Sequence, residues 1–150
     1  MKHILMIFLD GVGLGEDDPA TNPFAAANTP TLNSLTNGRR WLASTGREQS
    51  ARAIFVPTDP RMGVPGKPQS GSGQAAILTG RNVPALVGEH YGPRPNPAIR
   101  KLLAEDNIYK QVVARGMTAA LLEGYPPGWH QAVERGKRLR ASYQEAPHVA

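Results

Sequence analysis

A continuous apolar run, Ile4 to Leu9, opens the chain and ends directly at Asp10-Gly11. A short run that is apolar on both faces and bounded by glycine is typical of a buried central strand, in a sheet that is covered on both sides. Its six residues are fewer than the about 7–15 of a signal-peptide core or the about 20 of a membrane span. We therefore expect a soluble, cytoplasmic protein that has no membrane partner.

Helix and strand signals alternate along the rest of the chain. Apolar stretches that stop at glycine or proline predict two more strands, at 51–56 and 117–122. Capping residues, proline at first helical positions and glycine stops predict helices at 30–37, 74–79, 97–107 and 108–115. Such alternation favours an α/β fold, in which helices flank a mostly parallel sheet.

Composition and charge remove several classes of function. The 150 residues include no cysteine, which excludes a disulfide scaffold, a thiolate metal site and a cysteine nucleophile. The net charge is +5, but the basic residues cluster at 135–140 with few aromatic residues among them, and no nucleic-acid-binding motif is present. We interpret residues 131–150 as a basic, solvated tail that frays from Gln144, and we expect no nucleic-acid partner.

The turn after the first apolar run, Asp10 to Gly15, allows two chemical interpretations. A dinucleotide-binding turn requires the spacing G-x-G-x-x-G and a helix behind it. Here the spacing is G-x-G-x-G, and the acidic residues at 16–18 are unsuited to cradling a phosphate. The favoured interpretation makes Asp10 a metal ligand at the carboxyl edge of the sheet, with glycines that allow close access. The plainer alternative is that Asp10 only caps the turn.

A second candidate site lies in the segment from Pro68 to Gln74, just before the helix expected at 74–79. A serine hydroxyl at a helix N-terminus lies in the positive end of the helix dipole, which stabilises an alkoxide or binds an anionic phosphate. Neither a nucleophile elbow nor a phosphate-binding P-loop is present here. Taken alone, Ser70 is therefore more simply interpreted as a helix cap.

Two longer stretches, residues 8–35 and 57–80, together resemble the alkaline phosphatase-like metalloenzyme superfamily. This superfamily includes alkaline phosphatases, sulfatases, phosphopentomutases and cofactor-independent phosphoglycerate mutases. Its first strand ends at a metal-binding aspartate, which falls on Asp10, and its nucleophile begins a helix ten residues before a glycine stop, which gives Ser70 before Gly80. Gln74 occupies the position at which sulfatases carry arginine, so the resemblance favours phosphate over sulfate esters.

The resemblance implies a serine-based phosphoryl-transfer or phosphate-ester hydrolase that acts on a small phosphorylated substrate. Asp10 and Ser70 would bind the same ion of a pair of divalent metals, Zn or Mn, and Ser70 would attack phosphorus as the catalytic residue. We expect Gly71, Gly73 and Gln74 to contact the substrate. The alternative is a non-catalytic domain of the same fold that binds an anion at residues 71–74.

The remaining metal ligands of the superfamily are an Asp-x-x-x-His element, an Asp-His pair and a further histidine. The histidines of this chain, at positions 3, 90, 130 and 148, stand in neither context. One aspartate and one serine cannot hold two divalent ions. We therefore expect residues 1–130 to be the N-terminal part of such a domain, inactive alone and a weak metal binder, with a C-terminal half or a second chain supplying the other ligands.

Overall fold

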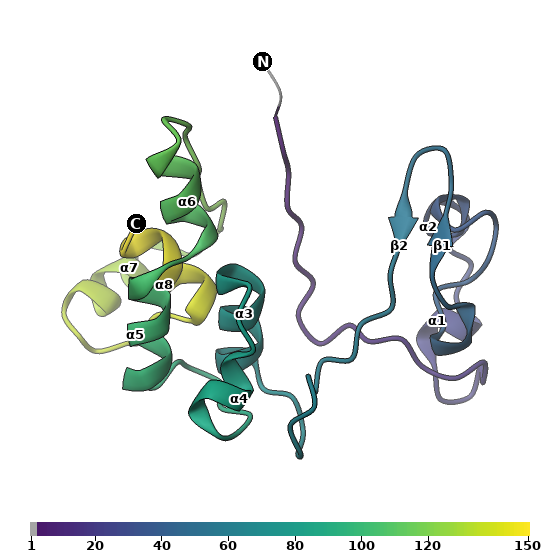
Figure 1. Cartoon of the computed structure of the whole chain (residues 1–150), viewed down its shortest axis with the longest axis horizontal. Coiled ribbons are helices and arrows are strands. Elements are labelled where there is room, and N and C mark those ends of the chain that lie inside the picture. The colour runs from purple at the N-terminus through teal and green to yellow at the C-terminus, as the bar shows by residue number, and fades with distance from the viewer. Residues whose placement is uncertain (1–2) are drawn as a thin grey trace. The chain divides into compact units, whose positions relative to one another are not determined.

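The chain, described here by a computed structural model for residues 3–150, forms two compact units, Met1–Asp59 and Pro60–Ala150. The first unit contains α1 (Pro23–Ala26), α2 (Pro30–Leu35), a 3₁₀ turn (Ala43–Thr45), β1 (Glu48–Gln49) and β2 (Ile54–Phe55) (Figure 1). The second contains α3 (Ser70–Thr79), α4 (Val83–Val87), α5 (Pro97–Glu105), α6 (Ile108–Ala114), α7 (Pro127–Glu134) and α8 (Ser142–His148). The predicted α/β fold with a mostly parallel sheet is therefore wrong, because residues 3–150 are mostly helical and their one sheet has two antiparallel strands.

Two of the predicted strands are extended but unpaired. Residues 4–9 form no strand, and their side chains are between 43% and 96% exposed. Residues 117–122 also form no strand, and Leu122 is 85% exposed. A strand that is apolar on both faces is stable only when neighbouring strands bond to its backbone and other layers cover its faces. Residues 3–150 provide neither for these two segments, which is why the expectation fails.

The third predicted strand, at 51–56, is shorter in the structure, where only β2 is a strand. It pairs with β1 in a short hairpin. Glu48 pairs with Phe55, and Gln49 pairs with Ile54. The turn between them is closed by Ser50, whose backbone N–H donates to the carbonyl of Ala53 (2.9 Å) and whose hydroxyl accepts from the amide of Ala53 (3.0 Å). Such a local pairing forms without the long crossover that parallel strands require.

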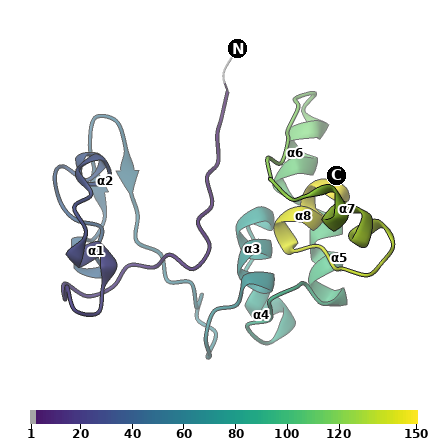
Figure 2. The ribbon, with the colours of Figure 1, turned by 180° about the vertical axis from the view of Figure 1, so that it is seen from behind.

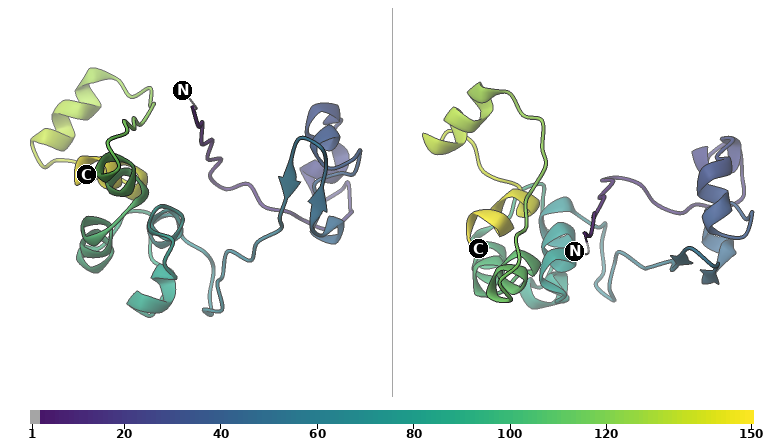
Figure 3. Two further views of the ribbon diagram at one scale, coloured as in Figure 1. Left: turned by 45° about the horizontal axis from the view of Figure 1, so that its top comes forward. Right: turned by 90° about the horizontal axis from the view of Figure 1, so that it is seen from above.

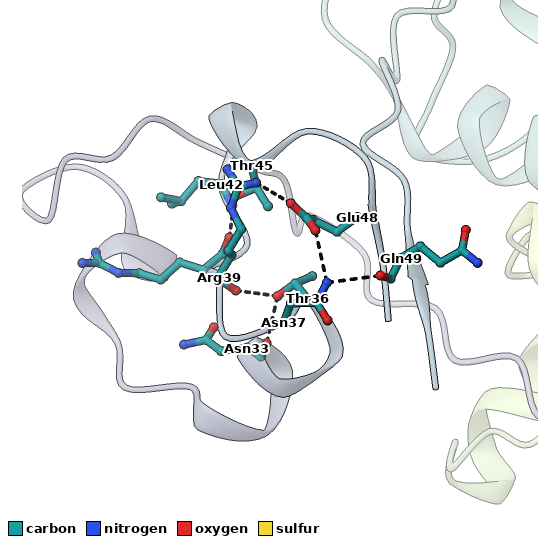
Figure 4. Close-up of polar contacts among 9 residues, drawn as sticks. Asn33, Thr36, Asn37, Arg39, Leu42, Thr45, Glu48 and Gln49 are labelled. Carbon is teal, nitrogen blue, oxygen red and sulfur yellow. Dashed lines mark hydrogen bonds and ion pairs between the residues drawn. The ribbon is translucent and has the colours of Figure 1, made fainter. Parts of the chain in front are cut away.

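Polar side chains hold much of the interior of the first unit. Thr36 is fully buried, and its hydroxyl lies within hydrogen-bond distance of the carbonyl oxygens of Asn33 (3.1 Å) and Arg39 (2.5 Å) (Figure 4). The buried Thr45 hydroxyl donates to the carbonyl of Arg40 (2.5 Å). The buried Asn22 likewise donates to the carbonyl of Glu16 (2.7 Å). These bonds fix loop backbone that has no regular partner.

The apolar core of the second unit is built around α3. Ala75, Ala76 and Leu78 of this helix pack with Val83 of α4, Ile99 and Leu103 of α5, and Ala146 of α8. Figure 2 shows α3 beside α5 and α8. The small residues of α3 allow these neighbours to approach its backbone closely. The helix that begins at Ser70 is therefore the most enclosed element of this unit.

The capping signal at Asn96 correctly predicts α5, and the helix predicted at 108–115 is confirmed as α6. Asn96 accepts a hydrogen bond from the amide of Ile99 (2.9 Å) at the start of α5. Asn107 accepts from the amides of Tyr109 (2.9 Å) and Lys110 (3.1 Å) at the start of α6. Both asparagines satisfy amides that have no partner within their own helix.

The C-terminal segment differs from the basic, frayed tail that the sequence predicts. Residues 142–148 form α8, in which Ser142, Gln144 and Ala146 are buried. Figure 3 shows α8 packed within the second unit, and α7 joined to α6 by a loop without strand structure. The helix is ordered because Ala146 enters the apolar core that centres on α3. Among residues 3–150, no helix is long and apolar enough to cross a membrane.

Candidate functional site

Ser70 is the first residue of α3, after the N-cap residue Gln69. The helix ends at Gly80, whose positive φ of 68° gives a left-handed C-cap, as the glycine stop in the sequence predicts. The helix begins four residues before the predicted 74–79 segment, so that Ser70 itself lies at the helix N-terminus. The predicted position of the serine is therefore confirmed, while its role as nucleophile stays a prediction.

A loop at residues 91–94 is bonded to the first turn of α3. The amide of Ser72 donates to the carbonyl of Tyr91 (2.8 Å), and the amide of Tyr91 donates to the hydroxyl of Ser72 (3.0 Å). Ser72 is fully buried, so both bonds are shielded from water. This reciprocal pair of hydrogen bonds gives Ser72, the second serine of the motif, a structural role.

Two glycines allow the loop and the helix to touch. A Cβ atom on Gly71 would lie 2.6 Å from the carbonyl oxygen of Tyr91 and 3.0 Å from that of Arg94. A Cβ atom on Gly92 would lie 3.2 Å from the amide nitrogens of both Ser70 and Gly71. Any side chain at position 92 would therefore cover the first two amides of the helix.

The opposite side of the same turn is held by α8. The buried Ser142 hydroxyl donates to the carbonyl of Gly71 at 2.6 Å. The bond joins residues 71 positions apart, and no local signal in the sequence indicates it. The sequence-based site therefore omits Ser142 and Tyr91, both of which fix the backbone beside Ser70.

The predicted substrate contacts at 71–74 lie on this turn but differ in accessibility. Gly73 is partly buried, and a Cβ atom there would meet no atom within 4 Å. Gln74 is buried, with 6% of its surface exposed. The amide of Gly73 donates to the carbonyl of Gln69 (2.9 Å) and that of Ser72 to Tyr91, so these two amides already have protein acceptors. Within the segment predicted to bind an anion, the amides that lie against Gly92 are those of Ser70 and Gly71.

Asp10 lies in the other unit, at an exposed turn completed by Gly11 with a φ of 72°. A Cβ atom on Gly11 or Gly13 would meet nothing within 4 Å, so here the glycines serve the turn rather than a close approach. Gly15 does lie close to a neighbour, since a Cβ there would lie 2.8 Å from Nδ2 of Asn22. Because Asp10 and Ser70 belong to different units, their shared ligation of one ion stays a prediction.

The residues described here do not by themselves fit a pair of metal ions. Among residues 3–150, no group of three or more His, Asp or Glu side chains is placed to hold a metal. His90 lies nearest in sequence to the 91–94 loop, and its Nε2 contacts the carbonyl oxygen of Val64 at 3.2 Å. A divalent transition metal normally takes three or four protein ligands, so a metal site would need donors from outside these residues.

A separate cleft of about 310 Å³ lies in the second unit and does not include Ser70. It is lined by residues of α7 and α8, among them Trp129 and His148. Tyr125 stacks on Trp129 with ring centroids 4.4 Å apart, and its hydroxyl lies 3.1 Å from that of Tyr143. Burial, and then the hydrogen bond and charge of Tyr125, raise the pKa of Tyr143 above its ordinary value.

Comparison of the chain with protein-family models, with curated proteins and with solved structures finds no match. The resemblance to the alkaline phosphatase-like superfamily therefore rests on the residues quoted from the sequence. Of those residues, Ser70 has the local structure that the resemblance requires at the start of a helix.

Proposed function

We propose that this chain contributes the serine nucleophile of a phosphoryl-transfer or phosphate-ester hydrolysis reaction on a small phosphorylated substrate. The observation that supports this most directly is that Ser70 begins a ten-residue helix whose first turn is held from two sides. The Tyr91–Arg94 loop contacts one side, and Ser142 of α8 contacts the other. A nucleophile held on rigid backbone needs little reorganisation before it reacts.

The chemistry of the turn suits phosphate. The positive end of the α3 dipole favours an anion beside Ser70 and stabilises negative charge on its oxygen. Glycine at position 92 lets the loop backbone lie against the amides of Ser70 and Gly71, where a Cβ atom would be 3.2 Å from each nitrogen. In the proposed complex, a phosphate group binds at this turn and Ser70 attacks its phosphorus atom.

The proposal includes a C-terminal half or a second chain that supplies further metal ligands. Two divalent ions, Zn or Mn, belong to the proposed complete enzyme, with Asp10 and Ser70 as the ligands from this chain. Without the other ligands we expect weak metal binding and negligible turnover by the chain alone. We propose the cytoplasm as the compartment, because a chain without cysteine gains no disulfide from an oxidising one.

Titration with inorganic phosphate, followed by amide NMR, tests the binding step. We expect the amide signals of Ser70 and Gly71 to shift, and the Gly92→Ala variant to bind phosphate more weakly. Gly128→Ala in α7 is the matched control, because a Cβ on Gly128 meets no atom within 4 Å. Unchanged signals at Ser70 and Gly71 would contradict a phosphate site at this turn.

The non-catalytic alternative, anion binding alone, is separated from phosphoryl transfer by a labelling experiment. The chain is incubated with acetyl phosphate, an activated phosphoryl donor, and enough Mn²⁺ to saturate a weak site. A single transfer to the protein, which requires no turnover, is then detected by mapping phosphoserine by mass spectrometry. Phosphoryl transfer predicts label on Ser70 and none on the buried Ser72. Phosphate binding without any label favours the alternative. Robust Ser70-dependent hydrolysis of phosphomonoesters by the isolated chain would contradict the need for further metal ligands.

A further inference from the structure

An extended apolar segment near the N-terminus, Ile4–Leu9, has no partner within its own unit. All six of its side chains are large and apolar, and each is more than two-fifths exposed, with Ile4 reaching 96%. Figure 1 draws this part of the first unit as a coil without an arrow. Single exposed apolar residues are common on proteins, but a continuous exposed run of this kind marks a surface that another chain covers.

The backbone of the same segment is also available for pairing. Within residues 3–150, the amides and carbonyls of 4–9 take part in no hydrogen bond between backbone groups. The residues are extended, free of proline and glycine, and rich in isoleucine, leucine and phenylalanine. An unpaired stretch with these properties is a template for a further β-strand.

The charges at the two ends of the segment indicate how a second copy would pair with it. Lys2 and His3 precede the run, and Asp10 follows it. Parallel pairing in register would place the two Asp10 residues on neighbouring strands only about 4.8 Å apart, and the two basic ends likewise. Antiparallel pairing instead brings the basic end of each copy to the acidic end of the other, and with Met6 at the centre it separates the two Asp10 residues by roughly 27 Å.

We propose that Ile4–Leu9 is a self-association segment, through which two copies of this chain pair as antiparallel strands about a twofold axis at Met6, so that the two copies of Met6 lie opposite each other. The uniform apolar character of the run makes it complementary to itself, since every position from Ile4 to Phe8 meets a large apolar residue in this arrangement. An isologous contact of this kind closes on itself and limits the assembly to a pair at each segment. Because a two-stranded ribbon is only marginally stable alone, the association is weak and depends on concentration.

Sedimentation of the full chain over a wide range of concentrations tests the association. The wild-type chain is expected to pass from monomer to dimer as its concentration rises, and Leu5→Lys to remain a monomer with an unchanged circular dichroism spectrum. Leu122→Lys is the matched control, because Leu122 is equally apolar and 85% exposed but lies in the other unpaired segment. The proposal is overturned if the wild-type chain stays monomeric at every concentration, even if the segment then binds some other protein. A Leu5→Lys variant that still dimerises, or a Leu122→Lys variant that does not, also overturns it.

The direction of pairing is tested by crosslinking, which the absence of native cysteine makes unambiguous. Single variants Met6→Cys and Leu9→Cys are treated with a short bis-maleimide. In the antiparallel pair the two copies of position 6 are neighbours, whereas the two copies of position 9 lie roughly 17–20 Å apart. We expect covalent dimer from Met6→Cys alone. Equal crosslinking of the two variants, or crosslinking of Leu9→Cys alone, refutes the antiparallel arrangement.

Discussion

Replacing one glycine of α3 with alanine should destabilise the second unit, while the same replacement two residues later should stabilise it. Gly71 and Gly73 both have φ outside the left-handed region and both lie in the first turns of the helix. Alanine is favoured over glycine in a helix by about 1 kcal/mol. With nothing within 4 Å of a Cβ at position 73, Gly73→Ala should gain about 0.5–1 kcal/mol.

At position 71 the new methyl group meets backbone. Its carbon would lie 2.6 Å from the Tyr91 carbonyl oxygen, and ordinary contact requires the loop to retreat by roughly 0.8 Å, an overpacking that costs about 1–3 kcal/mol. That retreat also weakens the two bonds between Tyr91 and Ser72, each of which contributes about 1 kcal/mol. After the gain in helix propensity is subtracted, Gly71→Ala should lower the free energy of unfolding by about 1–3 kcal/mol.

Urea denaturation followed by helical circular dichroism measures both variants. With a slope of about 1–3 kcal/mol per molar urea, we expect the Gly71→Ala midpoint to fall by about 1 M and the Gly73→Ala midpoint to rise. If both variants shift the midpoint upward, the loop does not press on the helix, and the argument for a rigid turn at Ser70 is refuted. If both variants lower the midpoint, helix propensity does not explain the effect of alanine at position 73.

Three further predictions concern the same unit. Ser142→Ala leaves the carbonyl of Gly71 without its 2.6 Å partner and should lower the free energy of unfolding by about 1–3 kcal/mol in urea. Asn107→Ala should lower the free energy of unfolding by about 2–4 kcal/mol in the same measurement. This fully buried residue caps α6 and also donates to the carbonyls of Leu103 and Ala146. An effect below about 0.5 kcal/mol would contradict both roles. Tyr143 holds its proton more tightly in the folded chain, so its stabilising contribution is complete below about pH 10 and is lost as the pH rises above that value. Tyr125→Phe should lower the pKa of Tyr143 in a titration of tyrosinate absorbance, and an unchanged titration curve would show that the two hydroxyls do not interact.

Elements set by neighbouring residues were predictable from the sequence. The asparagine caps of α5 and α6 and the glycine stop of α3 act within one helical turn, so their residue types are sufficient to locate them. The expected position of Ser70, ten residues before Gly80, came from the family resemblance, whereas the local signals placed the start of the helix at Gln74. In contrast, a strand is stable only through partners that are distant in sequence, and the apolar pattern of Ile4–Leu9 does not reveal whether the chain contains them.

The surroundings of Ser70 were not predictable for the same reason. The contacts from Tyr91 and Ser142 depend on how α3 packs against the 91–94 loop and α8. The polar, basic composition of residues 131–150 suggested a tail, whereas one buried alanine, Ala146, anchors the helix that carries Ser142. A candidate nucleophile could thus be found by pattern, but the residues that position it could not.

The polar interior of the first unit gives it a different response to temperature from that of the second. Its buried side chains are Asn22, Thr36 and Thr45 together with Ala25 and Leu42. Unfolding such an interior hydrates little apolar surface, and hydrating polar surface lowers the heat capacity, so its heat-capacity increment per residue is small. The stability of the first unit therefore varies little on cooling, whereas the aliphatic core around α3 gives the second unit a more strongly curved stability profile.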